Sequence, residues 1–265
     1  MQRAEIDALT LAYEDTGGEG PVVVFVHGLG GSAYVWWAQL AGARERGFRA
    51  IAYDQRGAGL SSRPGGPYSV ELWAEDLEGL LDAIGVERTA LVGHSVGCMV
   101  AEHAAHRLGE RAWALVLCGG RLAWPDGGSP VFEQRANLAH EGRMDEIAEA
   151  VAATGLTEAG RRANPALHGL VLRVLAANDN QGYAESALAT GRGAMRDPGA
   201  LGVPILAFAG EEDVVTPPDS AAEIAAAAGG EPAVVEGAAH WCMLERPDAV
   251  NELLLGFLDR HRPGD

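Results

Sequence analysis

Short runs of aliphatic and β-branched residues alternate along the chain with longer amphipathic segments. The runs predict strands at residues 22–26, 49–53, 89–92, 114–117, 205–209 and 233–236. The longer segments predict helices at residues 70–84, 96–108, 218–228 and 247–261. The first run has no polar alternation, as expected for a strand buried on both faces. The pattern is typical of an α/β fold with a mostly parallel sheet flanked by helices.

The alternation stops between residues 121 and 199. This segment carries helical patterns, for example at 144–154 and 165–177, and no convincing strand. A helical insertion in such a fold is most simply a lid over the carboxyl edge of the sheet, where open α/β folds place their sites. We therefore predict an α/β core formed by residues 1–120 and 200–265 and a helical cap formed by residues 121–199.

Length and charge narrow the function. The 265 residues suffice for a sizeable core, and 20 basic against 37 acidic residues give a formal net charge of −17 at pH 7. Nucleic acid and anionic membranes need a basic face, so we expect neither as a partner. Every basic residue is arginine and none is lysine, which excludes Schiff-base and Walker lysines. The widely spaced Cys98, Cys118 and Cys242 predict neither a disulfide framework nor a zinc knuckle.

The sequence predicts neither a signal peptide nor a membrane span. Its first ten residues lack a basic-then-apolar run, and no stretch approaches ~18 consecutive apolar residues. We therefore expect a cytoplasmic protein. The sequence leaves the oligomeric state open.

The sharpest chemical signal is the segment Gly93-His94-Ser95-Val96-Gly97, between a predicted strand and a predicted helix. It matches G-x-S-x-G, in which a serine nucleophile lies on a strained strand–turn–helix. Such a turn is crowded, and the two glycines supply the small neighbours it needs. The helix that follows directs backbone N–H groups and its positive end toward charge that develops at Ser95.

A serine hydroxyl needs a base, and the base needs an acid that orients it. Of the eight histidines, His240 follows the last predicted strand, at the edge of the sheet where Ser95 is expected. Asp213 follows the strand at 205–209 and is the candidate acid, with Glu212 as its nearest competitor. The strand at 114–117 is followed by Cys118-Gly119-Gly120, which offers no acid, and this favours Asp213.

Other residues are candidates for binding. An acyl oxyanion needs two donors, and we expect the N–H groups of Leu29, after the first buried strand, and of Val96 to supply them. Trp124 lies near the start of the insertion and Trp241 directly follows His240, so each is a candidate either for the wall of an apolar pocket or for packing in the core.

His103 and His106 share a predicted helix face with Glu102, a spacing that also suits a metal pair. The sequence places no third ligand, so we interpret this face as solvated and expect no metal.

Together these motifs resemble the α/β-hydrolase superfamily over essentially the whole chain. The resemblance rests on residues 27–30 and 54–61, the Ser95 turn, Asp213 and His240, in the order serine, acid, histidine. It implies an α/β-hydrolase fold with a helical cap inserted after the sixth strand. Asp54 and Arg56 are read as structural residues that pin the loop after the second predicted strand.

Within the superfamily the chain most resembles 3-oxoadipate enol-lactonases and neighbouring carboxylesterases, through residues 97–101 and 178–184. This resemblance implies hydrolysis of a small ester or lactone through an acyl-enzyme, without a cofactor. Cys98 stands where these lactonases commonly have glycine. Because lid residues select the substrate, enol-lactone is one candidate among small esters and lactones.

Four alternatives to an ester or lactone hydrolase stay open. C–C bond hydrolases and cofactor-free peroxidases share the same triad, and a ligand receptor can keep the fold without turnover. Residues 28–33 also satisfy G-x-G-x-x-A, with Asp54 at the end of the next strand, which is the pattern of an NAD-dependent oxidoreductase. That remote alternative leaves Ser95, Asp213 and His240 without a role.

Overall fold

The computed structural model describes residues 1–125 and 130–264. Its centre is an eight-stranded sheet in the order β1-β2-β4-β3-β5-β6-β7-β8. The pairs β1–β2 and β2–β4 are antiparallel, and every pair from β4–β3 to β7–β8 is parallel. The strands are β1 (Gln2–Ile6), β2 (Leu9–Asp15), β3 (Val22–Val26), β4 (Arg49–Tyr53), β5 (Thr89–His94), β6 (Ala112–Cys118), β7 (Ile205–Gly210) and β8 (Glu231–Val235).

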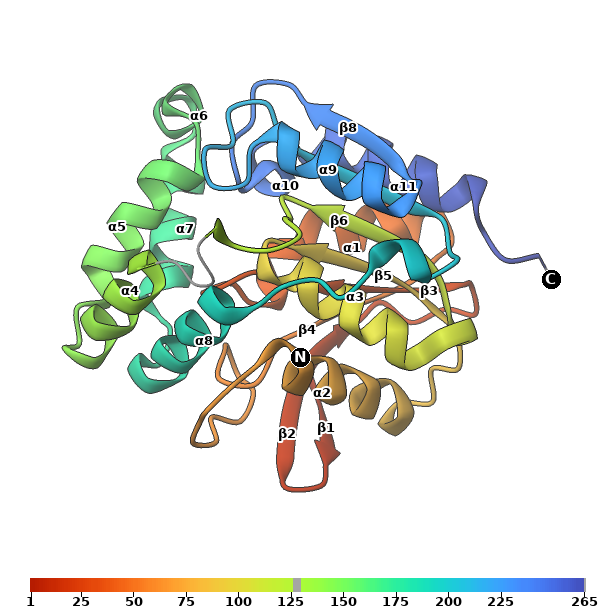
Figure 1. Ribbon diagram of the computed structural model, residues 1–265, viewed down its shortest axis with the longest axis horizontal. Helices are drawn as coiled ribbons and strands as arrows, with labels where there is room; N and C mark the ends of the chain where they lie inside the picture. The colour runs from red at the N-terminus through yellow and green to blue at the C-terminus, as the bar shows by residue number, and fades with distance from the viewer. Residues whose placement is uncertain (126–129, 265) are drawn as a thin grey trace.

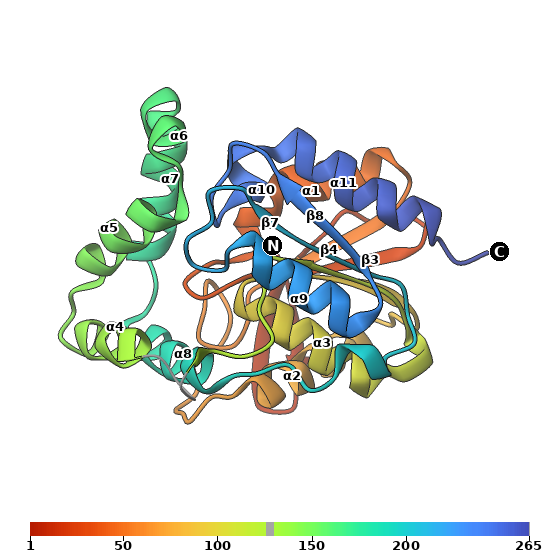
Figure 2. The same ribbon diagram turned by 45° about the horizontal axis from the view of Figure 1, so that its top comes forward.

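Helices cover both faces of the sheet (Figures 1 and 2). One side carries α2 (Val70–Ala83), α3 (Val96–Leu108) and α9 (Pro218–Ala228), and the other carries α1 (Trp37–Glu45) and α11 (Pro247–Arg260). Successive side chains of a strand point to opposite faces. In β3, Val23 and Phe25 therefore pack into the core on the α1 and α11 side, and Val24 packs into the core on the α2 and α3 side. The predicted fold class is confirmed.

Local signals explain where the core helices begin and end. Ser69 caps α2, because its side chain accepts a hydrogen bond from Leu72 N. Helix α9 starts at a proline, which tolerates the first turn, and ends at Gly229 in the left-handed conformation. The predicted bounds of the helices at 96–108 and 218–228 agree with α3 and α9.

Among the described residues, five α-helices lie between β6 and β7: α4 (Pro130–His140), α5 (Met144–Gly155), α6 (Glu158–Ala163), α7 (Pro165–Ala176) and α8 (Asn180–Arg192). We call them the helical insertion. In Figure 2 they form a layer of their own to one side of the sheet. Within the described part of residues 121–199 there is no strand, only an isolated bridge between Ala123 and Ala194.

Two features differ from the sequence-based expectations. The hairpin of β1 and β2 was not among the predicted strands. It forms the edge of the sheet, where β1 is mostly exposed and has little apolar alternation. The face of α3 that carries Glu102 and His103 is not solvated, because both side chains are buried. Glu102 accepts hydrogen bonds from Arg196 N and Asp197 N, so this face packs against the segment before β7.

Short helical turns complete the core: η1 (Ala33–Trp36), η2 (Gly109–Arg111), η4 (Pro198–Ala200) and α10 (Cys242–Glu245). None of the helices in the described ranges is both long enough and apolar enough to cross a membrane.

Candidate active site

Ser95 lies at the sharp turn between β5 and α3. Its backbone has φ 55° and ψ −122°, an unusual conformation for a residue with a side chain. The turn leaves no room on either side: a Cβ on Gly93 would lie 2.3 Å from Gly97 O, and a Cβ on Gly97 would lie 2.4 Å from Val26 O. Both glycines are therefore needed for the close packing of strand, turn and helix. The strained backbone presents Ser95 at the carboxyl edge of the sheet.

Asp213 and His240 meet in a direct hydrogen bond. His240 Nδ1 lies 2.8 Å from Asp213 Oδ2, and both side chains are buried. Asp213 comes from the loop after β7 and His240 from the loop after β8, so neighbouring parallel strands bring them together. Because Nδ1 faces the carboxylate, Nε2 is the ring nitrogen left to exchange a proton with another group.

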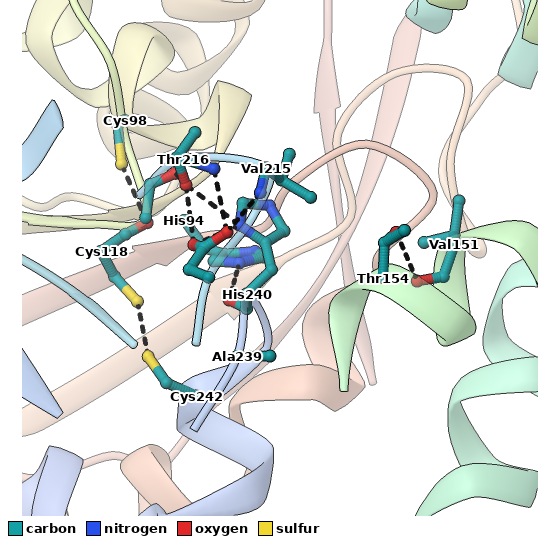
Figure 3. A network of polar contacts seen from close by, with 12 residues as sticks. His94, Cys98, Cys118, Val151, Thr154, Val215, Thr216, Ala239, His240 and Cys242 are labelled. Carbon is teal, nitrogen blue, oxygen red and sulfur yellow. Dashed lines mark hydrogen bonds and ion pairs between the residues drawn. The ribbon is translucent and has the colours of Figure 1, made fainter. Parts of the chain in front are cut away.

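Thr216 and the backbone beside it hold the Asp213 carboxylate in place. Asp213 Oδ1 accepts hydrogen bonds from Val215 N and Thr216 N, at 2.8 and 2.9 Å. Oδ2 accepts the Thr216 hydroxyl at 2.8 Å, and that hydroxyl also lies 2.9 Å from Gly119 O. Figure 3 shows Val215 and Thr216 beside His240.

Burial by itself would raise the pKa of Asp213, but the charge and hydrogen bond of His240, together with the bonds from Thr216, hold it below the usual value. The carboxylate is therefore ionised at neutral pH. A buried carboxylate in this state orients His240 and stabilises its protonated form.

His94 supports the loop that carries His240. Its Nε2 lies 2.9 Å from His240 O, and the two imidazole rings are 4.7 Å apart. Since a carbonyl oxygen accepts, Nε2 of His94 carries the proton. Burial, reinforced by the neighbouring His240, lowers the pKa of His94 to about 3. His94 is therefore a neutral donor at neutral pH.

Ser95 and His240 line one cavity of about 40 Å³. Most of its wall is apolar and includes Leu29, Trp124 and Trp241. Ligand pockets commonly measure ~300–1,000 Å³, so even a small substrate must displace part of this wall. The predicted pocket residues Trp124 and Trp241 thus lie at the same cavity as Ser95.

The insertion contributes six residues to the cavity wall. Phe132 and Arg135 of α4, Val151, Thr154 and Gly155 of α5, and Thr190 of α8 all line it. Arg135 is half-buried, and its guanidinium lies 5.8 Å from the centre of the Phe132 ring. It forms no ion pair with any described carboxylate.

The two predicted oxyanion donors are backbone groups near Ser95. Leu29 lines the cavity, and Val96 is the first residue of α3. In the described ranges, none of the backbone hydrogen bonds that close turns and loops uses the N–H of either residue. Both amides therefore remain available as donors.

Several competing candidates have other roles. Glu212, the alternative acid, is exposed. Asp54 is buried and accepts hydrogen bonds from Ala33 N and Leu60 N, one on each oxygen at 2.7 Å, so it holds two loops together. Arg56 pairs with Asp76, in agreement with its structural interpretation. This structural role of Asp54 argues against the hypothesis that residues 28–33 and Asp54 bind NAD.

The three cysteines are free and buried. Cys118 Sγ lies 3.4 Å from Cys242 Sγ, and Cys98 Sγ donates to Cys118 O (Figure 3). Burial raises the pKa of Cys98 and Cys118 far above the ordinary range for a thiol. Cys98 and Cys118 are therefore poor nucleophiles, and none of the three cysteines lines the cavity that holds Ser95.

Sequence reasoning missed Arg135, Thr216 and Glu245. Thr216 follows Asp213 by three residues, a spacing that could have marked it as a local donor to the acid. Arg135 carries no comparable signal, because only the folding of the insertion brings α4 to the cavity. Glu245 accepts hydrogen bonds from both the His240 loop and the insertion, and this pairing also depends on tertiary structure.

The sheet order, the serine turn and the adjoining acid–histidine pair define an α/β-fold hydrolase. A family model of the alpha/beta hydrolase fold matches residues 21–158, and the chain belongs to this family.

Comparison with similar proteins narrows the class of hydrolase. The chain is 28% identical to 3-oxoadipate enol-lactonase 2 of Acinetobacter baylyi, over 74% of this chain and 73% of that protein. The enol-lactonase structure from Burkholderia xenovorans LB400 superimposes with a TM-score of 0.91 at 30% identity, covering 97% of this chain and 100% of that one. A thermophilic esterase from Thermogutta terrifontis, solved with malate bound, gives a TM-score of 0.89 at 27% identity, covering 99% of each chain. The protein is therefore a hydrolase related to enol-lactonases.

Proposed function

We propose that the protein is a serine hydrolase that cleaves small carboxylic esters or lactones through an acyl-enzyme. The observation that carries the proposal is the 2.8 Å bond between His240 Nδ1 and Asp213 Oδ2, beside a cavity that His240 shares with the strained Ser95. The names of the enol-lactonase and esterase relatives support the same class of substrate.

In the proposed reaction Ser95 Oγ attacks the carbonyl carbon while His240 Nε2 takes its proton. The N–H groups of Leu29 and Val96 stabilise the tetrahedral oxyanion. His240 returns the proton to the leaving oxygen, which separates as an alcohol or, in a lactone, remains attached to the acyl chain. Water then attacks the acyl-enzyme with His240 as base, which releases the acid and restores Ser95.

Substitution of the catalytic residues tests this mechanism. Ser95→Ala should abolish hydrolysis of p-nitrophenyl acetate, and Asp213→Asn should lower kcat by about 10⁴ because the histidine loses its orienting acceptor. Glu212→Gln is the matched control and should retain activity. Circular dichroism would establish that each variant is folded. Full activity in Ser95→Ala would refute the nucleophile, and a large loss only in Glu212→Gln would show that Glu212, not Asp213, is the acid.

Arg135 supports a negatively charged substrate. It is a half-buried guanidinium in a mostly apolar cavity, and among the residues described it has no carboxylate partner. Arginine binds carboxylates through two parallel hydrogen bonds, and such bonds strengthen where water is excluded. The malate bound to the related Thermogutta esterase is a dicarboxylate and suits the same chemistry. We propose that the preferred ester or lactone carries a carboxylate held by Arg135.

A pair of substrates tests the role of Arg135. Arg135→Met should raise KM for a monoester of a dicarboxylic acid on the order of tenfold or more, since a charged hydrogen bond contributes ~1.5–3 kcal/mol. The KM for a neutral ester of similar size should change little. Equal changes for both substrates would indicate a packing role and contradict carboxylate binding.

We also propose the division of labour predicted from the sequence, with residues 1–120 and 200–265 as the catalytic core and residues 121–199 as a cap. Its support is that α4, α5 and α8 complete the wall of a cavity whose other wall holds Ser95 and His240. Substrate choice would then reside in the cap and bond cleavage in the core.

A further inference from the structure

One carboxylate joins the loop that carries His240 to the helical insertion. Glu245 Oε2 accepts a hydrogen bond from Ala239 N at 2.7 Å, and Ala239 directly precedes His240. Glu245 Oε1 accepts from Thr157 N at 2.9 Å and from Thr157 Oγ1 at 2.8 Å. Thr157 is buried and caps α6, because its hydroxyl also accepts from Gly160 N at 2.8 Å. The two oxygens of the Glu245 side chain thus bind two separate segments, one the His240 loop and the other the insertion.

A second link lies on the other side of His240. Trp241 N donates to Gly155 O, the last residue of α5, at 2.9 Å. The two segments are in close contact, since a Cβ on Gly155 would lie 2.8 Å from Trp241 Cδ1. The amides on both sides of His240 are therefore held by acceptors that belong to the insertion or are bonded to it.

The end of α5 is also cavity wall. Thr154 and Gly155 line the cavity, and Figure 3 shows Val151 and Thr154 on α5 across from His240. Glu245 does not line the cavity. Any effect of Glu245 on the reaction must therefore act through the two segments that it binds, the His240 loop and the insertion, rather than through contact with substrate.

We propose that Glu245 is a positioning residue: it fastens the His240 loop to the insertion, so that the catalytic base takes its working position only when the insertion is docked. This inference rests on the proposed serine-hydrolase function. A group misplaced by about 1 Å can cost ~10²-fold in rate, so the release of one end of this link is expected to affect turnover.

Glu245→Gln tests the link in the full-length protein. The amide has a single acceptor oxygen, so it can serve Ala239 N or Thr157 and not both. We expect kcat for p-nitrophenyl acetate to fall on the order of tenfold or more, with KM unchanged. Rates are normalised to the number of Ser95 sites that a fluorophosphonate titrates, which removes any contribution from unfolded protein.

Glu211→Gln is the matched control. Glu211 Oε2 accepts from Gly237 N of the same loop at 3.0 Å, but Glu211 has no hydrogen bond or ion pair with the insertion among the described residues. Its kcat should equal that of the wild type. An equal loss in Glu211→Gln would mean that any loosening of the loop suffices, and it would overturn the specific role of Glu245.

Gly160→Ala perturbs the same link from the insertion alone. The Cβ of an alanine there would lie only 2.2 Å from Glu245 Oε1, which is too close, so the carboxylate must shift. Gly169→Ala in α7 is the control, because that position is open. We expect kcat to fall in Gly160→Ala and not in Gly169→Ala, and the double variant with Glu245→Gln to lose no more than Glu245→Gln alone.

Two outcomes separate this inference from the proposed function. If Ser95→Ala hydrolyses the ester as well as the wild type, the serine mechanism itself fails. If hydrolysis depends on Ser95 but Glu245→Gln or Gly160→Ala keeps the wild-type kcat per titrated site, only the positioning role of Glu245 is overturned.

Discussion

At the scale of single residues, buried histidines make the free energy of unfolding depend on pH. His94 is neutral in the folded protein because burial lowers its pKa from 6.5 to about 3. Burial lowers the pKa of His27 as well. Between pH 3 and 6.5 the unfolded chain therefore binds a proton at His94 that the folded protein does not. By linkage, the free energy of unfolding falls as the pH drops below 6.5.

We predict that the unfolding free energy of the wild type declines between pH 7 and pH 5.5 and that His94→Gln reduces the slope. One differential proton corresponds to about 1.4 kcal/mol per pH unit once the pH is well below 6.5. Urea unfolding at several pH values measures the slope, and near-UV circular dichroism at pH 8 checks the native packing of the variant. Identical slopes in both proteins would show that His94 does not carry this proton.

At the scale of elements, the turn from β5 to α3 demands small residues for reasons of contact rather than helix propensity. Gly97 is the second residue of α3, and its missing Cβ allows β3 to approach, with Val26 O in the space that a methyl group would occupy. Gly256 lies within α11 with open space around it. The two glycines share a helical setting and differ in what surrounds them.

Alanine at these two positions should therefore have opposite effects. Gly256→Ala should stabilise the protein by about 0.5–1 kcal/mol through helix propensity. Gly97→Ala should destabilise it by roughly 1–3 kcal/mol, as overpacking does, and lower ester hydrolysis because Ser95 moves with the turn. Chemical denaturation and initial rates measure both quantities. A stable, fully active Gly97→Ala would contradict the tight approach of α3 to β3.

The same elements show how far sequence reasoning reaches. The Ser95 turn and the bounds of α3 and α9 follow from local signals, namely glycine spacing, prolines and apolar periodicity. The edge hairpin of β1 and β2 lacked such a signal, since an exposed strand such as Gln2–Ile6 has no continuous apolar run. Glu245 and Thr157 are 88 residues apart, and their contact depends on how the insertion docks. No local pattern encodes that docking.

At the scale of the whole molecule, the insertion contacts both loops that surround Ser95. Besides the Glu245 link to the His240 loop, Asn178 Nδ2 donates to Gly30 O at 2.9 Å, next to Leu29. A Cβ on Gly30 would also meet Leu175 at 2.7 Å and Tyr183 at 3.0 Å. The insertion is thus joined to the loop of a proposed oxyanion donor and to the loop of the proposed base. Its docking and the geometry of the site are expected to be interdependent.

Net charge sets another property of the whole molecule. The formal charge of −17 at pH 7 leaves far more carboxylates than arginines can pair. Exposed ion pairs such as Arg46–Glu252 and Arg143–Glu146 contribute little individually, because water and salt screen the two charges. Repulsion among the excess carboxylates acts over the entire surface and opposes the compact state. Salt screens both effects, since the Debye length falls from ~30 Å at 0.01 M to ~10 Å at 0.1 M.

We therefore predict that NaCl raises Tm at pH 8, because salt weakens the repulsion among carboxylates more than it weakens the attraction between arginines and carboxylates. Each kcal/mol gained shifts Tm by about 2–4 °C in a chain of this size, so calorimetric scans between 10 and 300 mM salt would resolve it. At pH 5.5, closer to the sequence pI of about 4.8, the net charge is smaller and the same increment of salt should raise Tm less. A Tm that falls with salt at pH 8 would mean that the arginine–carboxylate pairs outweigh the net repulsion.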